Sequence, residues 1–207
     1  AQNDQSGVGE SYLSSTASVS SLNFTGTHRC LGDETTDSLE TATSKGLIFV
    51  SAGKYMSLDG DTKPQMSEAL PIVKLATKRN DKACFGVAVG RETRRHTQRS
   101  FCVGGNFGTD YPKPEGESRF EINAVGEGSV WVCNINGNLE NGDYITTCEI
   151  PGYGMLQDDD LLHNYTVAKI TQDCTFELDN PYYHCVEFEF EGNTYRKAFV
   201  GCTYHCG

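Results

Sequence analysis

Short β-forming segments alternate with turn signals along most of this chain, and this alternation restricts the possible folds more than any other feature of the sequence. The segments are enriched in β-branched and aromatic residues, which favour extended strands. The predicted strands are 46–51, 70–76, 83–89, 119–125, 129–135, 144–150, 165–171 and 183–200. The turn signals between them are Asp59-Gly60-Asp61, Asn80-Asp81, Gly126-Glu127-Gly128, Asn136-Gly137, Asn141-Gly142-Asp143 and Gly192-Asn193. We therefore expect a mostly β fold: a single β-rich domain of short antiparallel strands and hairpins.

The best-defined hairpin spans residues 183–200, with Gly192-Asn193 as its two-residue turn. Because side chains alternate between the two faces of a strand, this turn determines which residues face each other. One face is predicted to be the core face, and it pairs Phe190 with Tyr195, Phe188 with Lys197 and Val186 with Phe199. The other is predicted to point to solvent or to a second subunit, and it pairs Glu191 with Thr194, Glu189 with Arg196 and Glu187 with Ala198.

Composition excludes several classes of protein. The chain has 207 residues, 37% hydrophobic and 10% aromatic, which is enough to bury a core and excludes wholesale disorder. No apolar run approaches the roughly 18 residues that a membrane span needs, so no membrane partner is expected. The net charge of −11 repels a phosphate backbone, so no nucleic-acid partner is expected either.

The N-terminal segment differs from the rest of the chain. Ten of its first 27 residues are Ser or Thr, only Asp4 and Glu10 are charged, and its apolar residues show no period. We interpret residues 1–27 as an extended N-terminal arm, either a flexible tail or a segment that orders against a neighbouring subunit. Residues 28–207 form the single β-rich domain.

Charge is separated along the chain. Between residues 74 and 99 eight basic residues face only two acidic ones, a local net charge of +6 that leaves −17 on the remainder. A molecule with separate basic and acidic surfaces attracts copies of itself, so these residues are candidates for an assembly surface. The alternative is that loops distribute these charges around the surface and form no patch. The eight are Lys74, Lys78, Arg79, Lys82, Arg91, Arg94, Arg95 and Arg99.

Nine cysteines without a C-x-x-C pair indicate an oxidising exterior. We expect at least three disulfides within the chain, and the odd cysteine is expected to be free or bonded to another chain. The candidates are Cys30, Cys84, Cys102, Cys133, Cys148, Cys174, Cys185, Cys202 and Cys206. A start at Ala1 without Met and two glycosylation sequons, at Asn23 and Asn164, are in keeping with a mature secreted protein.

Ligand-binding motifs are few, and no cofactor is expected. Asp158, Asp159 and Asp160 could bind a hard cation such as calcium, although a solvated acidic turn is the favoured interpretation of these residues. A zinc site built from His184, Cys185, His205 and the cysteines at 202 and 206 is the other metal hypothesis, and disulfides would compete for the same sulfurs.

Several segments together resemble a known family. In the second half they are Gly126-Glu127-Gly128-Ser129-Val130-Trp131-Val132-Cys133-Asn134, Gly137-Asn138-Leu139-Glu140-Asn141-Gly142-Asp143-Tyr144-Ile145-Thr146, Pro151-Gly152-Tyr153-Gly154 and Tyr165-Thr166-Val167-Ala168-Lys169-Ile170. In the first half they are Phe24-Thr25-Gly26-Thr27-His28-Arg29-Cys30, Gly46-Leu47-Ile48-Phe49-Val50, Glu68-Ala69-Leu70-Pro71-Ile72-Val73 and Phe85-Gly86-Val87. The pattern resembles the C-terminal intramolecular-chaperone and autoprocessing domain of phage neck-appendage and tail-fibre proteins and of fibre-like proteins of giant viruses.

This resemblance implies a β-rich, fibre- or chaperone-like domain over residues 28–207 that trimerises and, in some members, cuts the chain at its own N-terminal boundary. The acidic cluster that precedes the domain in processing members is not matched by Ser20-Ser21-Leu22-Asn23-Phe24, so no catalytic residue is carried over. The cysteine-rich profile also resembles skeletal scaffold proteins such as those of the axial filament of glass-sponge spicules, which implies an ordered lattice that templates silica.

We therefore expect a non-enzymatic, secreted structural protein that self-assembles into a homo-oligomer (a trimer, for example), a filament or a lattice and that contacts a mineral surface or a glycan. One alternative is a viral tail-fibre chaperone domain on the virion surface, with autoproteolytic processing. Another is a secreted, cation-dependent binding module.

Overall fold

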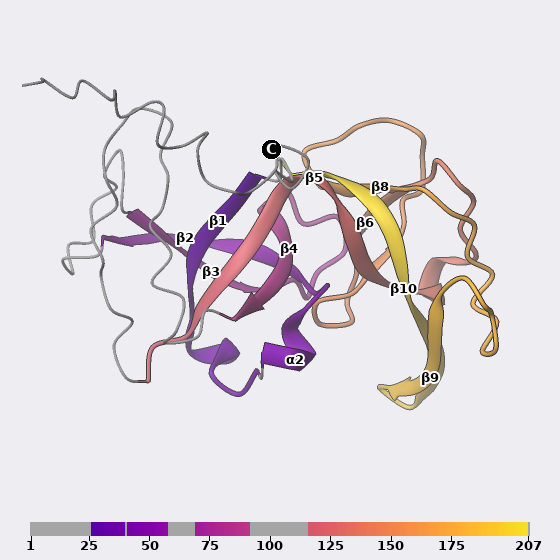
Figure 1. Ribbon diagram of the computed structural model, residues 1–207, viewed down its shortest axis with the longest axis horizontal. Helices are drawn as coiled ribbons and strands as arrows, with labels where there is room; N and C mark the ends of the chain where they lie inside the picture. Colours follow the sequence, from indigo (N-terminus) through magenta and orange to yellow (C-terminus); the bar gives the residue numbers. More distant parts are fainter. Residues whose placement is uncertain (1–25, 40, 58–68, 92–115, 207) are drawn as a thin grey trace, which may run out of the picture.

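The computed structural model describes residues 26–39, 41–57, 69–91 and 116–206, which form a mostly β, single β-rich domain, so the predicted fold class is confirmed (Figure 1). The short helical turns are η2 (Glu34–Thr36), α2 (Thr41–Ser44) and η3 (Asn134–Asn136). The strands are β1 (Gly26–Gly32), β2 (Ile48–Ser57), β3 (Ala69–Leu75), β4 (Cys84–Arg91), β5 (Arg119–Cys133), β6 (Tyr144–Thr147), β7 (Gly154–Leu156), β8 (Thr166–Ile170), β9 (His184–Phe190) and β10 (Asn193–His205).

All ten strands belong to one sheet, in the order β1-β3-β2-β4-β5-β7-β6-β8-β10-β9. Two further pairings, β1 with β5 and β5 with β10, close the sheet on itself twice. We call β1-β3-β2-β4-β5 the first strand ring and β5-β7-β6-β8-β10 the second strand ring. Most pairings are antiparallel, as predicted, but β1–β3 and β5–β7 are parallel, so the sheet is mixed.

Strand β5 joins the two rings because its two halves have different partners. Residues 119–125 pair with β1, and residues 125–133 pair with β10. The sequence predicted two strands here with Gly126-Glu127-Gly128 as the turn between them, and that turn is wrong. Strand β10 pairs with all three residues, so backbone hydrogen bonding keeps the chain extended where the composition favours a reversal.

A glycine is required at residue 128 because a tyrosine ring covers it. The hydroxyl of Tyr204 accepts a hydrogen bond from the Ser129 amide and donates one to the Ser129 carbonyl, both at 2.9 Å. This places the Tyr204 phenol directly over Gly128, where a Cβ atom would overlap with the hydroxyl. Burial raises the pKa of this phenol, so it keeps the proton that it donates.

The rings have separate cores, and β2 contributes to both. Phe49 packs in the cluster of the first ring with Phe120 and Ile122, whereas Ile48 and Val50 pack in the larger cluster of the second ring. Successive side chains of a strand point to opposite faces, so a strand buried on both faces needs a continuous apolar run. The run from residue 47 to 50 meets this need, and all four residues are buried.

The β9–β10 hairpin exists, but its predicted register is wrong by two residues. Phe190 pairs with Asn193, so the turn is Glu191-Gly192. Both turn residues have positive φ, 50° and 78°, as the favoured two-residue hairpin turn requires. A shift of two residues keeps every side chain on its predicted face.

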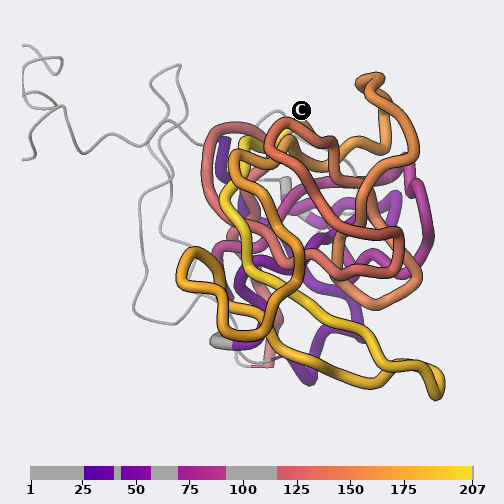
Figure 2. The backbone as a smooth tube through the Cα atoms, turned by 90° about the vertical axis from the view of Figure 1, so that its right-hand side faces the viewer, coloured from indigo at the N-terminus to yellow at the C-terminus, as the bar shows by residue number. Residues whose placement is uncertain are grey.

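The core face of the hairpin, however, is the one opposite to the prediction. Cys185, Ala198, Val200 and Cys202 enter the second-ring core, on the same face as the two strand glutamates. Glu187 and Glu189 are exposed, as predicted, because the tip of the hairpin extends beyond the core (Figure 1, Figure 2). Phe188 and Phe190 are only half-buried, on the other face.

The predicted arm overlaps β1 by two residues, Gly26 and Thr27, and residues 1–25 lie outside the described part of the chain. The sequence also missed β1, which lacks a clear alternating pattern, and β7, which has only three residues. The turn predicted at Asp59-Gly60-Asp61 lies outside the described residues.

The contact between Gly128 and Tyr204 yields a stability prediction. Gly128→Ala is expected to lower the free energy of unfolding by about 1 to 3 kcal/mol, because the added methyl group must displace the Tyr204 ring. Urea unfolding followed by circular dichroism measures it. Gly201→Ala is the matched control, since its Cβ would come no closer than 3.2 Å to another atom. Equal losses in the two variants would contradict this packing.

Candidate functional site

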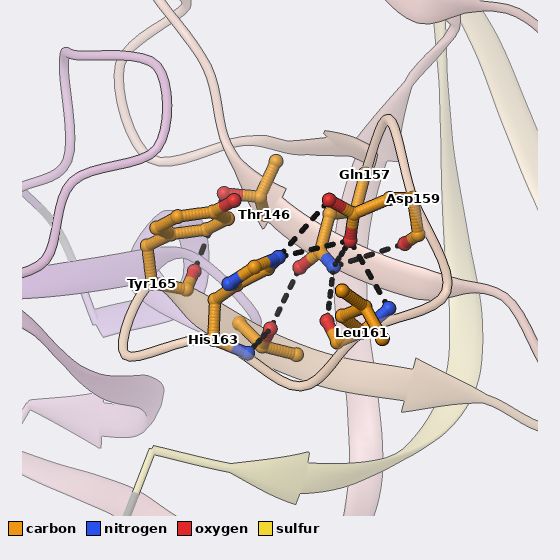
Figure 3. A network of polar contacts seen from close by, with 7 residues as sticks. Thr146, Gln157, Asp159, Leu161, His163 and Tyr165 are labelled. Atoms are coloured by element: carbon orange, nitrogen blue, oxygen red, sulfur yellow. Dashed lines mark hydrogen bonds and ion pairs between the residues drawn. The ribbon is translucent and has the colours of Figure 1, made fainter.

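A polar network orders the loop between β7 and β8 (Figure 3). The buried amide of Gln157 donates to the backbone oxygens of Asp159 (3.0 Å) and Leu161 (2.6 Å). Its oxygen accepts a hydrogen bond from the Thr166 hydroxyl at 2.7 Å. Because a buried amide is costly to leave unpaired, this arrangement strongly favours one loop conformation.

An Asp–His pair closes the same loop. Nε2 of His163 lies 2.9 and 3.0 Å from the two carboxylate oxygens of Asp159, and the imidazole stacks on Tyr165 with ring centroids 4.5 Å apart. The hydrogen bond to His163 and that from the Leu161 amide lower the pKa of Asp159. Within the described residues the imidazole makes hydrogen bonds only to Asp159, so the pair braces a loop and activates no described nucleophile.

The two metal hypotheses gain no support. In the part of the chain that the structure describes, no group of three or more His, Cys, Asp or Glu residues is arranged to hold a metal ion. The oxygens of Asp159 are engaged by Gln157, Leu161 and His163, and Asp158 accepts a hydrogen bond from Asn136 at 2.8 Å. Asp160 is exposed.

The predicted basic surface is divided by the fold. Lys74, Lys78 and Lys82 are exposed, whereas Arg79 lies 3.3 Å from Glu149. Arg91 turns inward and donates to the backbone oxygen of Leu39 and to the Ser118 hydroxyl. It therefore ties neighbouring segments together instead of joining an exposed patch. Arg94, Arg95 and Arg99 lie outside the described residues.

The cysteines form no disulfide among the described residues, which does not match the expectation of three or more. All eight described cysteines are free thiols, most of them buried, and Cys102 lies outside the described part. Two pairs are nevertheless in contact. The Sγ atoms are 3.4 Å apart for Cys84 and Cys206 and 3.7 Å apart for Cys133 and Cys148, longer than the roughly 2.05 Å of a disulfide.

The remaining sequence features are placed as follows. Asn164 is exposed, but the hydroxyl of Thr166 in the same sequon is buried in the Gln157 network. Asn23 lies outside the described residues. Among the residues that the structure describes, no helix is long or apolar enough to cross a membrane.

Strand β9 has a free outer edge. It pairs with β10 on one side, and no other described strand pairs with it. In a hairpin with a two-residue turn, the pair next to the turn exchanges both hydrogen bonds and the pattern then alternates. The backbone groups of the even-numbered residues of β9 therefore face β10. Those of the odd-numbered residues face outward, and these are Cys185, Glu187 and Glu189.

A hydrogen bond on β10 agrees with this alternation. The amide of Arg196, which pairs with Glu187, donates to the side chain of Asn134 at 2.8 Å, on the side away from β9. Consecutive outward N–H and C=O groups on an edge strand are a template for another strand. The outer edge of β9 is therefore our candidate functional site.

An aromatic cluster holds the hairpin against the second ring. At its centre the Lys197 ammonium lies 5.0 to 5.5 Å from the ring centroids of Tyr153, Phe188 and Trp131 and donates to the Tyr153 hydroxyl at 2.6 Å. These rings come from β9, from β5 and from the residue before β7. Cation–π attraction and ring stacking fix the edge of β9 relative to the domain.

Sequence reasoning missed this cluster. The alternation of the hairpin predicts Lys197 on a core face, and no local pattern relates it to Tyr153 and Trp131, because both lie far from it in the chain. The one available signal was the set of aromatic residues at alternate positions of the hairpin, Phe188, Phe190 and Tyr195, which indicates a surface that packs against another part of the protein.

Comparisons with known proteins found no matching family model, no similar curated protein and no similar solved structure. The resemblance to viral fibre domains and to spicule scaffolds therefore stays a prediction.

The Lys197 contacts predict how firmly the hairpin is anchored. Lys197→Met keeps the aliphatic stem and removes the charge, so it is expected to lower the free energy of unfolding by about 1 to 2 kcal/mol. Lys169→Met is the control: Lys169 is exposed and lies over a single ring, that of Tyr144, at 5.8 Å. Denaturant unfolding of both variants tests the difference, and equal effects would contradict the anchoring role.

The lowered pKa of Asp159 predicts an acid transition of the loop. The pKa of the Asp159 carboxyl is lower in the folded than in the unfolded protein, where it is about 3.9. The ionised carboxylate therefore stabilises the fold above about pH 3.9, and this stabilisation is lost as the pH falls through the folded-state pKa. The Leu161 amide bonded to Asp159 reports the change by NMR, with an expected midpoint below about 3.9. Asp159→Asn should abolish this titration. A midpoint at or above that pH would contradict the network.

Proposed function

We propose that this chain is a self-assembling structural protein in which the outer edge of β9 receives a strand from a neighbouring copy. The observation that carries the proposal is a seven-residue edge strand with outward backbone groups at alternate residues, held rigidly by an aromatic cluster. Strand addition is favoured at an edge that is already held in the extended conformation, because binding then costs less conformational entropy.

Two β9 edges are poor partners for each other. An antiparallel pair centred on Phe188 would set Glu187 of one copy opposite Glu189 of the other, and like charges directly opposed are destabilising. The strand that adds to β9 should therefore come from a different part of the neighbouring copy. Such a contact is head-to-tail, and it extends into a ring or a filament.

The N-terminal arm is the donor that we propose. Residues 1–25 precede β1 and carry only two charges, the acidic Asp4 and Glu10, so the uncharged stretch of residues 11–25 can approach the glutamates of β9 without repulsion between like charges. Fully extended, they would reach up to about 80 Å, more than enough to contact a second copy. The arm starts from the first ring and β9 lies at the far end of the second (Figure 1), which suits a contact between copies.

The setting of this assembly is part of the same proposal. The two sequons support an extracellular location, whereas the cysteines would support it only in an oxidised form that the described residues do not show. An ordered lattice outside the cell could present its exposed acidic and hydroxyl groups to a mineral surface such as silica, or to a glycan. In this role the protein is non-enzymatic and needs no cofactor.

The decisive experiment is sedimentation velocity across a range of protein and salt concentrations. Wild type is expected to associate, whereas Glu189→Pro and a chain lacking residues 1–25 are expected to stay monomeric. Proline at residue 189 removes an outward N–H and spares the bonds to β10. Glu189→Gln keeps that N–H and is the matched control, which should associate at least as well as wild type.

Two outcomes contradict the proposal: a wild type that stays monomeric at low salt and high concentration, or a Glu189→Pro variant that assembles like wild type. Circular dichroism of each variant confirms that the β fold is intact. Persistence of the assembly at high salt would separate pairing through the backbone from attraction between charged surfaces, which salt screens.

A further inference from the structure

Two cysteines from distant parts of the chain meet where the strand rings adjoin. Cys84 is the first residue of β4 in the first ring, and Cys206 follows β10 of the second, 122 residues later. Their sulfur atoms are 3.4 Å apart. The backbone amide of Cys206 donates to Ala124 of β5 at 2.9 Å, which holds the segment after β10 beside the first ring.

We propose that Cys84 and Cys206 are an oxidation site whose disulfide joins the first strand ring to the second. The sulfurs need to approach by only about 1.4 Å to reach bonding distance. Rotation of the Cys206 side chain, with a small movement of the segment after β10, supplies this approach. The inference does not depend on assembly through β9.

Exposure distinguishes this pair from the other thiol contact. Cys84 and Cys206 are half-buried, whereas Cys133 and Cys148 are fully buried in a satellite cluster of the core. The first contact lies at the partly exposed margin of the core and the second is enclosed within it, so a small oxidant reaches the first more readily. The Cys84–Cys206 bond should therefore form first.

The chemistry is thiol–disulfide exchange with a small disulfide such as glutathione disulfide. The hydrogen bond with Cys206 and burial raise the pKa of Cys84, so Cys84 keeps its proton and Cys206 attacks first. The Cys206 thiolate displaces one glutathione thiolate and forms a mixed disulfide. Cys84 then loses its proton, attacks the Cys206 sulfur and displaces the second glutathione. The protein loses two electrons and two protons, and two glutathione thiols are formed.

A bond between these residues should resist unfolding. It would close a loop of more than a hundred residues that includes β4, β5 and the rest of the second ring, and cross-linking so long a loop restricts the unfolded chain strongly. Oxidation is therefore expected to raise the urea midpoint of the domain.

The test uses the full reduced chain, equilibrated with glutathione buffers of increasing oxidising strength and then blocked with N-ethylmaleimide. Non-reducing digestion and mass spectrometry should find the peptides of Cys84 and Cys206 linked, at milder conditions than those of Cys133 and Cys148. The urea midpoint should rise with the linked fraction. Cys206→Ser should lose both effects, and Cys202→Ser, which alters a neighbouring cysteine of β10, should keep both.

Three results would overturn the proposal: maleimide on both Cys84 and Cys206 under the most oxidising buffer, a linkage of Cys84 to another cysteine, or a midpoint that rises equally in Cys206→Ser. The reduced form of Cys206→Ser should unfold at the wild-type midpoint. A large shift there would show that the thiol contact itself, not the disulfide, supports the fold, and would also count against the site.

Discussion

Pairing along both halves of β5 is the constraint on which the rest of the structure depends. One extended strand of 15 residues closes the first ring through β1 and the second through β10. Closing a sheet on itself removes free edges and satisfies backbone groups that would otherwise need other partners. The glycines at residues 126 and 128 lie where the strand passes from one ring to the other, and one of them makes room for the Tyr204 ring.

Closure also explains why β9 stands out. Each strand of the two rings has neighbours on both sides, whereas β9 is added outside the second ring and pairs on one side only. The face of β9 that carries Phe188 packs against the rings around Lys197, and the backbone groups on the outer edge of β9 stay available. Among the described strands β9 is the one that pairs with a single neighbour along its whole length, which favours strand addition at that site.

The cysteines fall into two groups, isolated thiols in the core and pairs of thiols whose sulfur atoms are in contact. Burial is the main cause that raises the pKa of Cys174 to about 11 and that of Cys202 to about 12, so these thiols stay protonated and unreactive in the core. Among the described cysteines, two pairs of sulfurs lie in contact and so within reach of oxidation: Cys84 with Cys206 and Cys133 with Cys148. Nine cysteines in a sequence cannot distinguish these two situations, because connectivity depends on which strands adjoin.

Local pattern was sufficient for the β class, for the alternation of the hairpin and for the exposure of Glu187 and Glu189, because these depend on side-chain period and turn chemistry. It failed at Gly126-Glu127-Gly128, where pairing with β10 overrides the turn preference. It also missed the Lys197 cluster and the core face of the hairpin, because both are assembled from residues far apart in the chain. The sequence by itself determined the β class, most of the strand segments and which faces alternate, because these depend on local side-chain pattern. Only the tertiary structure decided which edge stays open and which thiols meet, because ring closure joins segments that no local pattern relates.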